Sequence, residues 1–122
     1  MLQNTLFSLK MSLTSSQILS KGNSAKFIEL IQRYNKGELV YPGVLIRKLG
    51  ISQTQAYKVL DMLKEQGILE INYEVYCHEC SQFKGPIYET FGKIPEELDC
   101  ECCGVKLDPL NNSIVIYKMI AD

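Results

Sequence analysis

Two pairs of cysteines, each spaced C-x2-C, constrain the fold of this 122-residue chain more than any other feature. The first pair is Cys77 and Cys80, and the second is Cys100 and Cys103. A C-x2-C turn lets two sulfurs reach one metal ion, and a second pair on a neighbouring hairpin completes a tetrahedron. The spacing therefore predicts one zinc ion bound by Cys77, Cys80, Cys100 and Cys103.

Two neighbouring residues offer alternatives to this ligand set. Cys102 could replace Cys103, but Cys103 keeps the paired spacing and precedes Gly104, which adopts a positive φ without strain. His78 lies inside the first pair, where its ring would point away from the ion. An iron–sulfur centre and a set of reduced, metal-free thiols are the remaining alternatives to zinc.

The predicted zinc site is structural, because four thiolates leave no open position for water or substrate. The only histidine is His78, and the sequence has no phosphate loop, dinucleotide fingerprint or H-E-x-x-H motif. Acidic residues gather between 96 and 101, where we expect a solvated surface rather than catalytic carboxylates. We therefore expect that the protein is not an enzyme.

Composition is that of a folded domain, with 46% hydrophobic and 22% charged residues. The length suits one domain, or one domain with a small appendage. No apolar run approaches the roughly 20 residues that a membrane-spanning helix needs, and the first residues do not resemble a secretion signal. These features predict a cytoplasmic protein without a membrane partner, in a compartment where clustered thiols stay reduced.

Apolar residues at spacings of three and four predict three helices ahead of the first cysteine pair. We expect them at residues 24–35, 44–49 and 53–66. Ser24 and Ser52 are suitable N-caps for the first and third helices. A glycine follows each helix and favours its end at that point.

The segments outside these helices are predicted to form an N-terminal arm and short strands. Residues 1–23 fit both an alternating strand and a helical stripe, and we favour a helix followed by a serine-rich loop at 14–23. Apolar runs predict strands at 39–41, 70–76 and 114–120.

Two segments of this chain carry a family resemblance: Leu49-Gly50-Ile51-Ser52 and Glu65-Gln66-Gly67-Ile68-Leu69. Together with the apolar stripe between them, they resemble the second and third helices of the winged helix-turn-helix superfamily, of the prokaryotic transcription-regulator type. The resemblance covers residues 24–76, with a last strand at 114–120.

The resemblance implies an α+β fold with three helices and a wing of two strands. Both cysteine pairs fall between the two wing strands, so we expect a small β zinc ribbon inserted in the wing. The implied organisation is an arm at 1–23, a winged helix at 24–76 plus 114–122, and a zinc-ribbon insertion at 77–113.

The resemblance also implies double-stranded DNA as a partner, read by the N-terminal part of the third helix in the major groove. The residues placed there are Ser52, Gln53, Thr54, Gln55, Tyr57 and Lys58. Charge is consistent with this, because residues 1–64 hold nine Lys and Arg against three acids. Lys26, Arg47, Lys48 and Lys64 could meet phosphates. The sequence thus indicates a transcriptional regulator that binds DNA.

The alternative is a protein-interaction adaptor inside a larger transcription or nucleic-acid complex. The third helix has no arginine, the isoelectric point is about 5.8, and residues 65–122 hold eleven acids against four lysines. An acidic ribbon in place of the wing would repel DNA. A protein partner, or a second copy of the chain, could bind through the N-terminal segment or through the zinc ribbon.

Overall fold

A computed structural model describes residues 1–83 and 86–122 in full, and residues 84 and 85 only as part of a strand. The chain divides into two compact units. The helical unit comprises residues 1–70 and 117–122, and the cysteine unit comprises residues 71–116.

The fold is α+β, as the sequence predicts. Its α-helices are α1 (Gln3–Ser16), α2 (Lys21–Ile31), α3 (Pro42–Leu49), α4 (Gln53–Glu65) and α5 (Pro109–Asn112), with a 3-10 turn at Phe91–Lys93. Its strands are β1 (Leu39–Val40), β2 (Leu69–Cys77), β3 (Gln82–Tyr88), β4 (Leu98–Asp99), β5 (Lys106–Leu107) and β6 (Ser113–Met119). One sheet has the order β1-β6-β2-β3, and the other is β4-β5.

Helix α3 ends and helix α4 begins where the sequence predicts, because their boundary residues fix the backbone locally. Helix α3 begins at Pro42, two residues before the expected start at 44. Pro42 is the first residue of α3, and Gly50 ends it with a φ of 64°. Ser52 and Gln55 form a capping box at the start of α4. The Ser52 hydroxyl accepts a hydrogen bond from the Gln55 backbone N–H, and the Gln55 side chain accepts one from the Ser52 N–H, both at 3.1 Å.

The N-terminal region is helical, but the predicted start of the helix expected at 24–35 is wrong. Helix α2 begins at Lys21 with Ser20 as its N-cap, four residues before the expected cap Ser24. The Ser20 hydroxyl accepts a hydrogen bond from the Asn23 N–H at 3.1 Å, so Gly22 falls in the first turn instead of a loop. The connection from α1 is therefore only residues 17–20, and α2 ends at Ile31 rather than at 35.

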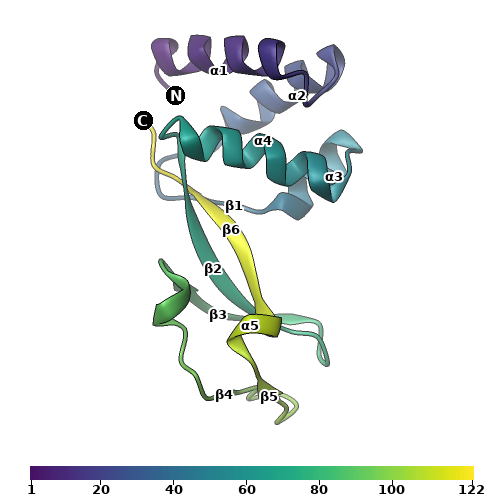
Figure 1. Cartoon of the computed structure of the whole chain (residues 1–122), viewed down its shortest axis with the longest axis vertical. Coiled ribbons are helices and arrows are strands. Elements are labelled where there is room, and N and C mark those ends of the chain that lie inside the picture. The colour runs from purple at the N-terminus through teal and green to yellow at the C-terminus, as the bar shows by residue number, and fades with distance from the viewer. The chain divides into compact units, whose positions relative to one another are not determined.

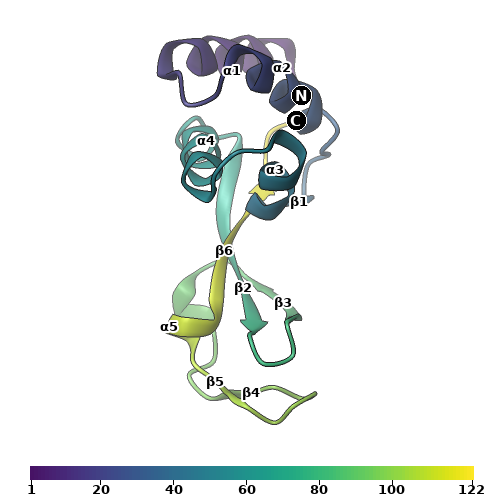
Figure 2. The same cartoon turned by 90° about the vertical axis from the view of Figure 1, so that its right-hand side faces the viewer.

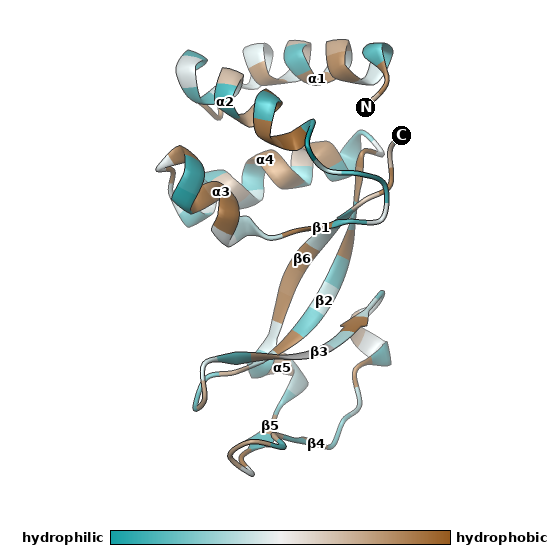
Figure 3. Ribbon diagram, turned by 180° about the vertical axis from the view of Figure 1, so that it is seen from behind, coloured by the Kyte–Doolittle hydropathy of each residue, from teal (hydrophilic) through white to brown (hydrophobic). Residues whose placement is uncertain are grey.

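The helices of the helical unit pair along their apolar faces. Helix α1 lies beside α2, and α3 lies beside α4 (Figures 1 and 2). Hydrophobic and hydrophilic stretches alternate along α1 and α2 (Figure 3), as expected when one side of each helix is buried. The fully buried side chains of these four helices include Leu9, Phe27, Ile31, Leu45, Val59, Leu60 and Leu63.

The C-terminal end of the chain completes the helical unit. Strand β6 pairs antiparallel with β1, with Val40 opposite Tyr117. The two termini lie close together (Figure 1), and the Leu2 N–H donates to the Asp122 carbonyl at 3.0 Å. Tyr117 is 1% exposed, and its hydroxyl donates to Asp61 on α4 at 2.5 Å. Segments far apart in sequence thus meet around one buried tyrosine.

The capping box predicts that substitution of Ser52 lowers the stability of the protein. Ser52→Ala removes the acceptor for the Gln55 N–H and should lower the free energy of unfolding by about 1 kcal/mol. Urea unfolding followed by circular dichroism measures this. Ser15→Ala, on the exposed end of α1, is the matched control and should change stability by less than about 0.5 kcal/mol. Equal effects of the two substitutions would contradict a capping role for Ser52.

The Tyr117–Asp61 hydrogen bond predicts that the free energy of unfolding depends on pH in the alkaline range. Burial, then the hydrogen bond to Asp61, raises the pKa of Tyr117 above its usual value. The unfolded chain releases this proton at about pH 10, whereas the folded protein keeps it to a higher pH. The stabilisation is therefore complete below about pH 10 and is lost progressively as the pH rises above it. Tyr117→Phe should lower stability at pH 7 by about 1–2 kcal/mol. It should also make the alkaline decline shallower than in the wild type, and parallel declines would contradict this assignment.

Candidate metal centre

The first cysteine pair lies in the turn between β2 and β3. Cys77 is the last residue of β2 and pairs with Gln82, the first residue of β3. Ser81 takes a left-handed conformation, with a φ of 54°, which closes the turn after Cys80. The strand pairing therefore fixes where Cys77 and Cys80 point.

The second pair lies in the loop between β4 and β5. These strands pair antiparallel, with Leu98 opposite Leu107. The Cys100 N–H donates to the Val105 carbonyl and the Gly104 N–H donates to the Cys100 carbonyl, both at 2.8 Å. Gly104 has a φ of 72°, the positive value expected after the last cysteine. This short hairpin presents Cys100 and Cys103 on one side of the turn.

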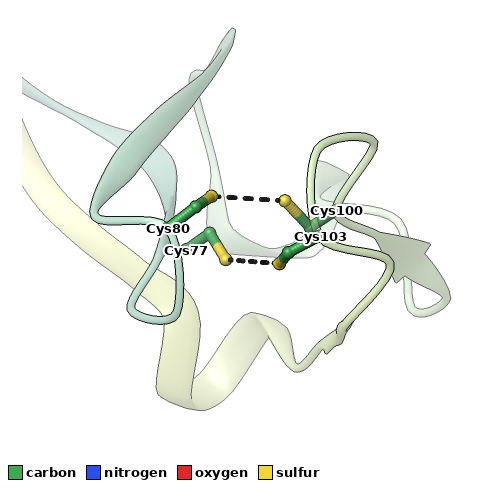
Figure 4. Close-up of side chains that lie close together, drawn as sticks. All are labelled: Cys77, Cys80, Cys100 and Cys103. Atoms are coloured by element: carbon green, nitrogen blue, oxygen red, sulfur yellow. Dashed lines mark hydrogen bonds between the residues drawn. The ribbon is translucent and has the colours of Figure 1, made fainter.

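The four sulfurs converge on one point (Figure 4). Cys80 Sγ lies 3.5 Å from Cys100 Sγ, and Cys77 Sγ lies 3.6 Å from Cys103 Sγ. All four sulfurs lie within 4.8 Å of one another. A tetrahedron with zinc–sulfur bonds of about 2.3 Å has edges of about 3.8 Å. The arrangement could therefore hold one metal ion after sulfur–sulfur distances change by up to about 1 Å.

The surroundings favour protonated thiols until a metal displaces the protons. Hydrogen bonds to Cys77 and Cys100 raise the pKa of Cys80 to about 12. A backbone hydrogen bond from Val105 lowers the pKa of Cys103, but the hydrogen bond to Cys100 and desolvation outweigh it and raise the pKa overall. Metal binding must consequently release protons, so apparent metal affinity increases with pH.

The cysteines form much of the small core of the cysteine unit. Its buried cluster is Val75, Cys77, Ile94, Cys100 and Leu107. Cys77 is 0% exposed and Cys100 is 2% exposed, whereas Cys80 is half-buried and Cys103 is exposed. A core this small is typical of units that need a metal or disulfides for stability, and all five cysteines here are free thiols.

The two alternative ligands lie outside the sulfur cluster. Cys102 is exposed, and its sulfur lies 3.8 Å from the Gln82 side-chain oxygen. The His78 ring nitrogen Nε2 lies 3.4 Å from the Asn111 carbonyl. The cluster therefore uses Cys103, and neither Cys102 nor His78 belongs to it.

Sequence reasoning missed the short helix α5, which supports the first cysteine pair. The Asn112 side chain donates a hydrogen bond to the Tyr76 carbonyl at 3.1 Å, next to Cys77. Asp108 caps α5 by accepting a hydrogen bond from the Leu110 N–H, and Pro109 is its first residue. The Asp-Pro pair is a helix-start signal that could have predicted this element.

Three of the residues predicted to contact DNA are exposed on α4, namely Gln53, Thr54 and Lys58. Ser52 and Gln55 are exposed or half-buried, and both side chains are engaged in the capping box. Gln53, Thr54 and Lys58 are therefore accessible to a partner, whereas Ser52 and Gln55 make local structural contacts.

Gln55 and Tyr57 have further contacts inside the helical unit. The Gln55 side-chain amide donates to the Ile18 carbonyl at 3.2 Å and so ties α4 to the α1–α2 connection. The Tyr57 ring is half-buried, with its centroid 6.4 Å from that of Tyr117. Burial, followed by the charge of Asp61, raises the pKa of Tyr57.

The structure brings together two of the lysines expected to meet phosphates. A shallow depression of about 160 Å³ between α2 and α3 is lined by Lys26, Glu29, Leu30, Arg33, Lys48 and Leu49. The sequence predicts phosphate contacts for Lys26 and Lys48, and the structure adds Arg33 beside them. Arg33 is exposed and forms an ion pair with Glu29 at 3.2 Å. The spacing of four residues between Glu29 and Arg33 could have predicted from the sequence that both side chains lie on the same face of the helix.

No family model, curated protein or solved structure matches this chain. Among the described residues, the helices fall short of the length and apolar character that crossing a bilayer requires.

The sulfur geometry predicts that the four cysteines bind one metal ion, and Co²⁺ can be used as a spectroscopic probe of this site. Tetrahedral Co²⁺ with four thiolates absorbs strongly in the visible range, so titration should show one Co²⁺ per chain, displaced by Zn²⁺. Cys80→Ser should weaken binding at least about tenfold. Cys102→Ser is the matched control and should leave the spectrum and the stoichiometry unchanged. Loss of the spectrum in Cys102→Ser, or its retention in Cys80→Ser, would contradict this ligand set.

Proposed function

We propose that this chain is a zinc-stabilised, winged-helix DNA-binding protein that regulates transcription. The observation that carries the proposal is the exposure of Gln53, Thr54 and Lys58 at the start of α4. The opposite face of that helix is buried through Ala56, Val59, Leu60 and Leu63. A helix anchored in this way can present its first turns to the major groove.

The strand order supports the winged-helix part of the proposal. Strand β6 lies between β1 and β2, so β2 and β6 are neighbours although 35 residues separate Cys77 from Ser113. In a winged helix, the two strands after the third helix are adjacent and the wing joins them. Here that connection carries β3, β4, β5 and α5, together with Cys80 and the second cysteine pair.

The distribution of charge supports DNA binding by the helical unit. The helical unit holds ten Lys and Arg against six acids, whereas the cysteine unit holds three lysines against eight acids. Four thiolates on one divalent ion would add about two negative charges to the cysteine unit. DNA would therefore be attracted to the helical unit and repelled by the cysteine unit.

We assign zinc to the four-cysteine site on the chemistry of its donors. Four thiolates at tetrahedral spacing suit Zn²⁺ better than Mg²⁺ or Ca²⁺, which prefer oxygen ligands. With every position filled by sulfur, the ion has a structural role. It would stabilise the small core around Cys77 and Cys100.

Within this proposal, base edges and phosphates are met by different residues. Gln53 and Thr54 have side chains able to contact adenine and a thymine methyl group, respectively. Lys58, and the depression lined by Lys26, Arg33 and Lys48, offer cations to the phosphate backbone. The phosphate contacts would supply affinity, and the first turns of α4 would supply sequence preference.

The salt dependence of binding to random-sequence duplex DNA tests the proposal. Zinc-loaded protein should bind at low salt and lose affinity steeply as salt rises. Lys26→Ala/Lys48→Ala should weaken binding and reduce the slope of log affinity against log salt by about two. Fluorescence anisotropy of labelled duplex measures both quantities.

Lys93→Ala/Lys106→Ala is the matched control, because it removes two lysines from the cysteine unit instead. It should leave affinity and slope nearly unchanged. Absence of binding at low salt, or equal effects of the two double variants, would refute DNA binding by the helical unit. Gln53→Ala with unchanged sequence preference would refute the role of α4.

A further inference from the structure

The cysteine unit contains a small hollow beside the second cysteine pair. Its volume is about 140 Å³, and its lining residues are Val75, Pro86, Tyr88, Leu98, Asp99 and Glu101. Val75, Tyr88 and Leu98 are buried or half-buried and line it with apolar and aromatic side chains from β2, β3 and β4. Asp99 and Glu101 are exposed and add two carboxylates to the lining. We refer to it as the acid-edged hollow.

The size of the hollow limits what it can hold. Cavities of about 150 Å³ accommodate a group the size of benzene, whereas sites for whole small molecules are usually about 300–1,000 Å³. A single side chain of a binding partner therefore fits better than a free metabolite. Anchoring by one side chain in a pocket is a common way for protein interfaces to gain affinity.

The chemistry of the lining selects the type of side chain. Asp99 and Glu101 have no ion-pair partner among the described residues, although Lys106 lies opposite Asp99 in the β4–β5 pairing. An arginine has an apolar stem for Val75 and Leu98, and a planar guanidinium that can stack on the Tyr88 ring. The same guanidinium can donate paired hydrogen bonds to a carboxylate at the edge. A lysine satisfies the charge but offers neither the stacking nor the paired hydrogen bonds.

The net charge of the cysteine unit favours the same partner. Eight acids against three lysines attract positively charged segments from solution. From the hollow, its lining and this charge, we propose that the cysteine unit docks an arginine-bearing, basic segment of a partner protein, with the arginine seated in the acid-edged hollow. This interaction is separate from DNA binding by the helical unit, and either one can fail without the other.

Binding of two charge-matched peptides to the full zinc-loaded chain tests this proposal. One blocked peptide contains glycine, serine and lysine around a central arginine, and the other has lysine in place of that arginine. The arginine peptide should bind about fivefold tighter or better, because only guanidinium stacks on Tyr88 and pairs with a carboxylate. Amide shifts in a nuclear magnetic resonance titration should change at residues 98–101. Equal affinity of the two peptides would overturn the proposal.

Two double variants separate the hollow from general electrostatics. Asp99→Asn/Glu101→Gln should weaken binding of the arginine peptide about tenfold. Glu96→Gln/Glu97→Gln removes the same charge outside the hollow and should weaken binding less than about twofold. Both variants should still bind one Co²⁺ with the wild-type spectrum, which shows that the cysteine unit is folded. Equal losses in the two variants would overturn the proposal.

Two further measurements distinguish a partner protein from other occupants. Blocked free arginine should bind much more weakly than the peptide, and equal affinity would indicate a small-molecule site instead. Sedimentation should show no self-association that depends on Arg33 or Arg47, the two arginines of this chain. Dimers lost on Arg47→Ala would place a second copy in the hollow and overturn the assignment to a partner.

Discussion

The convergence of four cysteine sulfurs within 4.8 Å is the contact on which the cysteine unit depends. Two of the four, Cys77 and Cys100, are also members of its five-residue buried cluster. A bound ion would join the β2–β3 turn to the β4–β5 loop, which are otherwise held by a few short strands. The neighbouring hollow is lined by residues that lead into Cys77 and Cys100, so the same ion would also fix the proposed docking site.

The helical unit depends on a different principle, which is apolar packing with defined helix ends. The Ser52–Gln55 capping box fixes the start of α4, and the Gln55 amide extends that network to the Ile18 carbonyl. Tyr117 on β6 connects the C-terminal strand to Asp61 on α4. Local hydrogen bonds and the buried stripe of α4 together leave the residues proposed to contact DNA on the outer face of the helix.

The opposite charges of the two units suggest a division of labour in the proposed function. A basic helical unit suits nucleic acid, and an acidic cysteine unit suits a basic protein segment. DNA binding and protein docking were competing interpretations of the whole sequence. The division of the chain into two units allows both proposals, each assigned to the unit whose charge and exposed residues fit it.

The sequence by itself determined the cysteine spacing, the end of α3, the start of α4, and the strands on either side of the cysteines, because these follow from local signals. Paired C-x2-C turns, Pro42, Gly50 and Ser52 act on their own neighbourhood in the chain. The sequence misplaced the start of α2, because Ser24 was the expected cap whereas Ser20 caps the helix in the structure. Only the tertiary structure decided that the four sulfurs lie within 4.8 Å of one another, and that Lys26, Arg33 and Lys48 share one depression. These outcomes depend on how separate segments approach one another in space, which residue spacing alone does not specify.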